Sequence, residues 1–175
     1  MQNKSKIAIL LTFLFFIGCK KEDATPVAPV IKFVEANVAS NNASAVVKIE
    51  FLDKNGDLGL KQEENSGEQK YNVFVDYYEK IDGEWILKSP IVTPRQDITS
   101  PSGWVYDTTN TNVRIPFLEN DAQRALQGEV KLDLLLDGLS FFESLGADTF
   151  KYDIYIKDRS LRSSNVITTT ELIID

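Results

Sequence analysis

The chain has 175 residues, with 19 basic and 26 acidic side chains, one cysteine and no histidine. Its acidity argues against nucleic acid as a partner, because a negatively charged protein repels the phosphate backbone. The lack of histidine excludes Ser-His-Asp and Cys-His catalysis and His-ligated zinc, which leaves carboxylate chemistry and oxygen-ligated cations.

The first 18 residues have the features of a secretory signal peptide. Lys4 and Lys6 precede an apolar run over 7–17 that a single threonine interrupts. This run is too short to span a bilayer, which takes about 20 residues. It ends in Ile17-Gly18-Cys19, which resembles the lipobox of bacterial lipoproteins, where the cysteine is lipidated and becomes the mature N-terminus. The resemblance implies a lipid anchor on Cys19 and leaves no free thiol.

Residues 19–29 are predicted to form a flexible tether, because they are charged, small or proline and offer little to bury. Lys21, Glu22 and Asp23 resemble the surface-export signal of Bacteroidetes lipoproteins, a lysine and two acidic residues soon after the cysteine. The resemblance implies display on the cell surface. The alternative is an ordinary charged tether that holds the protein at the periplasmic leaflet.

The mature chain is strongly acidic. With the signal peptide removed, 17 basic side chains remain against 26 acidic ones. A polybasic grip on anionic lipid is therefore not expected, and the acyl chains should hold the protein on the membrane.

From residue 30 onward, apolar and polar residues alternate with the period of a β-strand. The alternating segments are 46–51, 71–78, 130–136 and 150–157, and a β-branched segment closes the chain at 166–174. Asn55-Gly56 and Asp82-Gly83 both predict two-residue hairpin turns, because type I′ turns require positive φ angles. The second turn would join a strand over 71–81 to one over 84–87.

One segment has the spacing of a cation-binding loop. Oxygen-bearing side chains occupy positions 1, 3, 5 and 12 of the loop, as in an EF-hand. They are Asp53, Asn55, Asp57 and Glu64. Position 6 is leucine rather than glycine and the flanks are predicted strands, so an EF-hand is not expected and a β-flanked calcium site is the hypothesis. The alternative is a structural turn with solvated carboxylates.

Aromatic residues are candidates for ligand contact. Phe74 and Tyr78 share one face of the predicted strand 71–78. Trp104 lies within 89–112, where three prolines and many polar residues predict a loop or an irregular edge. Aromatic rings near carboxylates suit carbohydrate stacking or a protein contact, whereas most aromatic residues of a sandwich pack in the core.

Asp107-Thr108-Thr109, in the same segment, resembles a short O-glycosylation motif of Bacteroidetes envelope proteins. The resemblance implies a glycan on Thr108.

The sequence contains few helix signals. Residues 118–127 are predicted to contain a helical turn, with Asn120 as its cap and Gly128 as its stop, and 140–147 to contain another short turn. Short strands separated by turns predict an all-β fold, an antiparallel immunoglobulin-like β-sandwich of about seven or eight strands over residues 30–175.

Two segments carry family resemblances. Residues 152–159, followed by Ser163-Ser164-Asn165 and a last strand, are similar to the closing strands of fibronectin type III and related immunoglobulin-like domains. Residues 48–60 resemble a segment near the start of uncharacterised Bacteroidetes lipoproteins, where a strand runs into an Asn-Gly-Asp turn. The resemblance implies a family and an outer-membrane location, and it carries no activity.

Two functional hypotheses follow. The first is a lipid-anchored, non-catalytic domain that binds a glycan or an envelope protein, or has a structural role, at the cell envelope. The second is a glycosidase-like hydrolase that uses two carboxylates and has a calcium-braced loop. The missing histidine, the small size and the sandwich fold favour the first hypothesis.

Overall fold

The computed structural model describes residues 27–40, 44–119, 124–135 and 148–174. Cys19, Lys21, Glu22, Asp23 and the segment 140–147 lie outside the described residues. No helix in the described ranges is long and apolar enough to cross a membrane. The regular elements are β1 (Val30–Val38), β2 (Ser44–Asp53), η1 (Gly67–Gln69), β3 (Val73–Ile81), β4 (Glu84–Leu87), β5 (Ile91–Gln96), β6 (Trp104–Thr109), β7 (Leu126–Leu135), β8 (Thr149–Ile156), β9 (Ile167–Thr168) and β10 (Leu172–Ile173).

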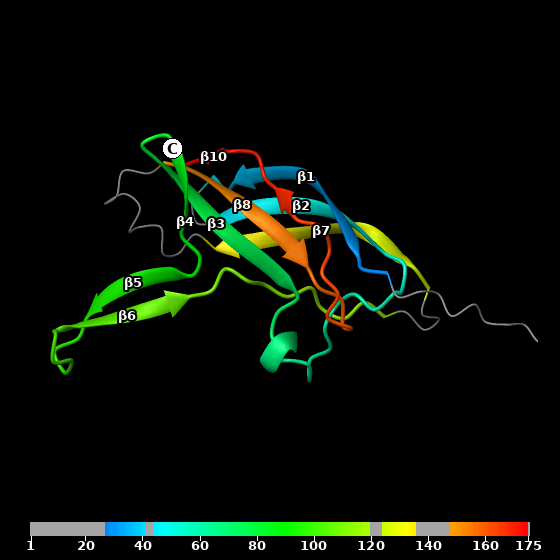
Figure 1. Ribbon diagram of the computed structural model, residues 1–175, viewed down its shortest axis with the longest axis horizontal. Coiled ribbons are helices and arrows are strands. Elements are labelled where there is room, and N and C mark those ends of the chain that lie inside the picture. The colour runs from blue at the N-terminus through cyan, green and yellow to red at the C-terminus, as the bar shows by residue number, and fades with distance from the viewer. Residues whose placement is uncertain (1–26, 41–43, 120–123, 136–147, 175) are drawn as a thin grey trace, which may run out of the picture.

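Eight of the ten described strands form two antiparallel sheets that pack as a sandwich, which confirms the predicted all-β fold. One sheet has the order β1-β2-β7; the other has the order β10-β8-β3-β4, and β9 also pairs with β8. Figure 1 shows β3 and β8 crossing over β2 and β7.

The alternation of side chains along β2, β3 and β8 creates the core between the sheets. Every second residue of these strands is buried, and the residues between them face outward. The rings of Tyr77, Phe150 and Tyr152 pack together with centroid separations of 5.6–5.7 Å. Burial of these apolar groups, at about 25 cal/mol per Å², is the main force holding the two sheets together.

The two predicted hairpin turns have different outcomes. Asp82 and Gly83 both have positive φ angles, 51° and 86°, and they join β3 to β4 as predicted. The prediction for Asn55-Gly56 is wrong, because only Gly56 has a positive φ and β2 and β3 lie in different sheets. Backbone N–H groups that bond to the Asp53 carboxylate turn the chain there instead.

The segment 89–112 is more regular than predicted. β5 and β6 pair antiparallel over six residues each and form a two-stranded ribbon that projects from the sandwich (Figure 1). Pro94 is compatible with this pairing when its missing N–H is on the outer edge of β5, where no partner strand needs a donor. The proline-rich, polar composition of the segment predicted a loop or an irregular edge, whereas the structure has a pair of strands.

Two further predictions are corrected. β7 begins at Leu126 and pairs with β2 over ten residues, so the predicted helical turn is wrong at its C-terminal end, while 120–123 lies outside the described residues. The segment forms a strand because its alternating apolar residues, such as Leu132 and Leu134, are buried in the core. The closing segment is two short strands, β9 and β10, rather than one.

Candidate functional site

The β5–β6 ribbon is attached to the sandwich along one edge of β3. Ser89 Oγ accepts a hydrogen bond from Tyr77 N–H at 2.8 Å, just before the ribbon begins. After the ribbon, Asn112 Oδ1 accepts a hydrogen bond from Val75 N–H at 3.0 Å, and Val113 exchanges two backbone hydrogen bonds with Val73. Both ends of the ribbon are thus fixed to the same strand, beside the position where β4 leaves it.

One side of the ribbon is uncharged and largely exposed. Residues opposite each other in an antiparallel pair share a face, so the register assigns every second residue of both strands to one side. This side, called the ribbon face below, carries Val92, Pro94, Gln96, Trp104, Tyr106 and Thr108. Trp104 is 45% exposed and Tyr106 is 67% exposed. Large aromatic residues with this exposure are typical of a surface that meets a ligand.

The reverse side and the tip of the ribbon are held by polar contacts. Arg95 Nε lies 3.0 Å from Asp107 Oδ2 on the reverse side. At the tip, Thr99 donates two hydrogen bonds to Asp97, which hold the pKa of this carboxyl below its ordinary value. Ile98 is fully exposed at the tip. The tip is a hydrogen-bonded loop that presents one apolar side chain.

Phe74 and Tyr78, the other predicted contact residues, lie on the outer face of β3 and not on the ribbon. The Phe74 ring stacks on Tyr155 at a centroid distance of 4.9 Å, and Lys157 lies over it at 5.1 Å. Lys151 lies over Tyr78 at 5.5 Å. The structure therefore separates Trp104 from this pair, and neighbouring side chains of the protein itself contact the rings of Phe74 and Tyr78.

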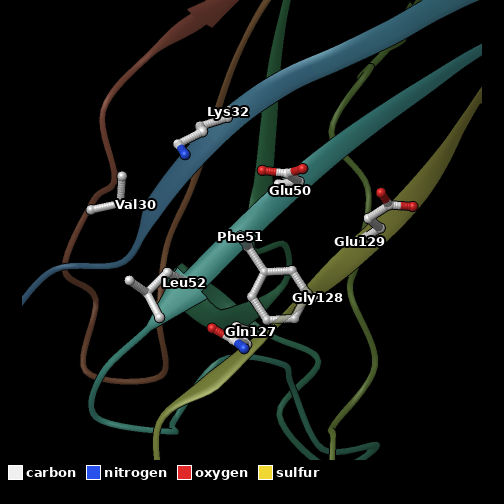
Figure 2. Close-up of a pocket in the computed structure, with 8 residues that line it drawn as sticks. All are labelled: Val30, Lys32, Glu50, Phe51, Leu52, Gln127, Gly128 and Glu129. Carbon is white, nitrogen blue, oxygen red and sulfur yellow. The ribbon is translucent and has the colours of Figure 1, made fainter.

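A shallow hollow of about 450 Å³ lies on the β1-β2-β7 sheet (Figure 2). Figure 2 shows Lys32, Glu50 and Glu129 in a row on one side of the Phe51 ring. Glu50 and Glu129 are opposite each other in the β2–β7 register. The pKa of Lys48, on the same sheet, is raised chiefly by its hydrogen bond to Glu35. The negative charge of Glu129 raises this pKa further. The hollow is lined by a ladder of opposite charges.

The predicted calcium ligands have other partners. Asp53 is fully buried and accepts hydrogen bonds from Asn55 N–H at 3.0 Å and Leu58 N–H at 2.7 Å. Asp57 Oδ2 accepts a hydrogen bond from Ser160 Oγ at 2.7 Å. The Asn55 amide donates to the Val27 carbonyl oxygen. The loop residues thus satisfy the backbone and neighbouring side chains rather than a common centre.

Two arginines of the closing hairpin complete this network. Arg162 pairs with Asp57 at 3.4 Å and with Asp158 at 3.0 Å, and Arg159 Nε lies 3.4 Å from Glu64 Oε1. Burial raises the pKa of Asp158, and the negative charges of Asp57 and Asp53 raise it further. In the part of the chain that the structure describes, no three carboxylate, histidine or cysteine side chains have the arrangement of a metal site. Calcium binding stays a prediction.

Thr108, the predicted glycosylation site, is exposed on the ribbon face. A glycan at this position would lie beside Tyr106, but the modification itself stays a prediction. Comparison of the chain with protein-family models, with curated proteins and with solved structures finds no match. The resemblance to Bacteroidetes lipoproteins therefore also stays a prediction.

Sequence reasoning singled out Trp104 but did not predict that Tyr106 shares its face, and it missed Val92, Pro94 and Gln96 from the opposite strand. The alternation of Trp104, Tyr106 and Thr108 was the available signal. It was hidden because β5 contains a proline and the segment between the strands is rich in serine and threonine. The arginine partners of Asp57 and Glu64 were missed for a different reason, since they are about 100 residues distant in sequence.

Proposed function

We propose that the protein is a lipid-anchored, non-catalytic binding module of the cell envelope, which contacts its ligand through the β5–β6 ribbon. The anchor is Cys19, on an outer-membrane lipoprotein that Lys21, Glu22 and Asp23 direct to the cell surface. The ligand is a glycan or an envelope protein.

One observation carries the binding role: Trp104 and Tyr106 are exposed together on an element that projects from the sandwich. A two-stranded ribbon has little stability of its own in water, and neither ring is needed to cover the core. Figure 1 places the ribbon at one end of the molecule and the beginning of β1 at the other. A tether that enters at β1 would leave the ribbon free to reach away from the membrane.

A two-carboxylate hydrolase is the second candidate, and the hollow in Figure 2 is the observation that favours it. Glu50 and Glu129 both line the hollow and are register partners on neighbouring strands. A hydrolase of this class uses two carboxyl groups about 5–10 Å apart. Lys32, the register partner of Glu50, also lines the hollow, which favours a solvated row of opposite charges over a catalytic pair. Release of new reducing ends from a polysaccharide, lost in both Glu50→Gln and Glu129→Gln, would favour the hydrolase over the binding module.

Cell fractionation tests the anchored location. The full chain should sediment with membranes, and Cys19→Ala should appear in the soluble fraction because it lacks the acylated residue. Ser102→Ala, on the ribbon, is a matched control and should stay in the membrane fraction. If Cys19→Ala remains in membranes, the lipid anchor is not what holds the protein there.

A further inference from the structure

We infer that the ribbon face binds a neutral polysaccharide chain, an inference that rests on the proposed binding function. The ribbon face is the ligand-contacting side of β5 and β6, with Trp104 and Tyr106 as its aromatic centre. Its dimensions, its charge and the placement of its polar groups each support this ligand class.

The width of the ribbon argues for a slender ligand. Two strands about 5 Å apart and six residues long give a face of roughly 10 Å by 20 Å, or about 200 Å². A stable protein–protein interface takes about 800 Å² from each partner. The ribbon face alone is much smaller than that, whereas a single polysaccharide strand can lie along or across it.

The charge of the ribbon face argues for a neutral ligand. None of its six residues is ionisable near neutral pH. Arg95 lies on the reverse side and is already paired with Asp107 at 3.0 Å. The chain has a net charge of −7. An acidic polymer would bring unpaired charges onto an apolar surface of a negatively charged protein, which is unfavourable.

The polar groups of the ribbon face are placed beside the aromatic rings. Gln96 is the register partner of Trp104, and Thr108 follows Tyr106 at the next position on the same side. The backbone positions of Trp104 and Tyr106 are about 7 Å apart along β6. A sugar ring has an apolar C–H face that packs on an aromatic ring and hydroxyl groups that bond to amides and hydroxyls. Each ring of the ribbon face therefore has a neutral hydrogen-bonding group within reach of one sugar unit.

The outer face of the β3–β4 hairpin, where Trp85 of β4 is the register partner of Lys80, fits this ligand less well. Lys151 lies 4.6 Å from the centre of the Trp85 ring, and Lys80 lies 5.4 Å from it. These ammonium groups take the ring surface that a sugar would need. Trp85 and Trp104 thus represent two competing aromatic surfaces, one occupied by lysines and one open.

The chain has only two tryptophans, which allows each surface to be tested separately. In Trp85→Phe, the remaining fluorescence comes from Trp104; in Trp104→Phe, it comes from Trp85. The full chain in detergent micelles is titrated with neutral hexose oligosaccharides of four or more units, and with uronic-acid oligosaccharides of the same length. We expect a saturable change in the Trp85→Phe emission with the neutral series and none in Trp104→Phe.

Side-chain truncation adds a second readout. Tyr106→Ala in the Trp85→Phe background should raise the half-saturating oligosaccharide concentration about tenfold. Thr109→Ala, on the reverse side of β6, should leave this concentration unchanged. A response only from Trp85, a preference for the acidic series, or no response to any oligosaccharide would overturn the inference. If the sugars fail but protease-sensitive envelope material still binds the wild type and not Trp104→Ala, the ligand is a protein and the binding function survives.

Discussion

Arg162 Nη2 lies 3.4 Å from Asp57 Oδ2. The positive charge of the closing hairpin thus offsets the negative charge of Asp57, which is 105 residues earlier in the chain. The same guanidinium contacts the buried carboxylate of Asp158 at 3.0 Å. Asp57 was predicted to bind calcium, and in the structure the guanidinium of Arg162 pairs with its carboxylate. Any calcium ion in this loop would have to compete with Arg162.

This competition gives the first prediction. Arg162→Gln should lower the free energy of unfolding by about 1–3 kcal/mol, because it leaves Asp57 and Asp158 without their cation. If the loop can bind calcium, millimolar Ca²⁺ should raise the melting temperature of Arg162→Gln more than that of the wild type. Thermal melts with calcium and with chelator measure both effects. Identical melting temperatures with and without calcium in both proteins would remove the calcium hypothesis.

The fold and the site differ in how far the sequence determines them. β2, β3 and β8 were predictable because residues such as Val47, Val75 and Ile154 alternate strictly with outward-facing neighbours. The pairing of Asp57 with Arg162 was not, because it depends on which loops meet at the end of the sandwich. The ribbon was missed because a projecting pair of strands needs no buried side, so Pro94 and the flanking serines dominated the pattern.

The second prediction concerns Arg114, which organises the loop before β3. Its guanidinium donates hydrogen bonds to the carbonyl oxygens of four loop residues. They are Lys61, Glu64, Gln69 and Lys70. Arg114→Ala should destabilise the protein by about 1.5–3 kcal/mol, because partly buried and exposed carbonyl acceptors lose a charged donor. Hydrogen exchange should accelerate over residues 61–70 and not in the ribbon. Unchanged protection of this loop would show that Arg114 does not hold it.

The third prediction uses two glycines with positive φ angles. A Cβ on Gly59 would lie 2.4 Å from the Pro116 carbonyl oxygen, whereas a Cβ on Gly103 would meet nothing within 4 Å. Gly59→Ala should therefore cost about 2–4 kcal/mol, through steric overlap and backbone strain together. Gly103→Ala is the matched control and should cost only about 1 kcal/mol, from its φ angle. Urea unfolding of both variants measures the difference, and equal losses would contradict the close contact at Pro116.

The fourth prediction concerns pH. Glu79 is buried, which raises the pKa of its carboxyl above the ordinary value of 4.5, while Lys88 at 3.5 Å offsets part of this effect. A carboxyl whose pKa is higher in the folded state stabilises the fold when protonated, and this contribution is lost as the pH rises through the folded-state pKa. Glu79 should therefore make the protein less stable at about pH 7.5 than at about pH 5.

Glu79→Gln tests this sign directly. Glutamine cannot ionise, so the decrease in unfolding free energy from about pH 5 to about pH 7.5 should become smaller than in the wild type. Thr109→Ala, a non-ionisable exposed position on β6, is the control and should keep the wild-type slope. A Glu79→Gln profile that is parallel to the wild type would mean that burial does not shift this carboxyl.

The binding role of the ribbon is the central claim, and capture of envelope material tests it most directly. The full chain, immobilised in detergent micelles, is incubated with solubilised cell envelope beside the double variant Trp104→Ala/Tyr106→Ala and the control Phe74→Ala/Tyr78→Ala. We expect the wild type and the β3 control to retain the same envelope component, and the ribbon variant to lose it. Equal retention by the ribbon variant, with loss in the β3 control, would contradict the proposal and assign ligand contact to the outer face of β3.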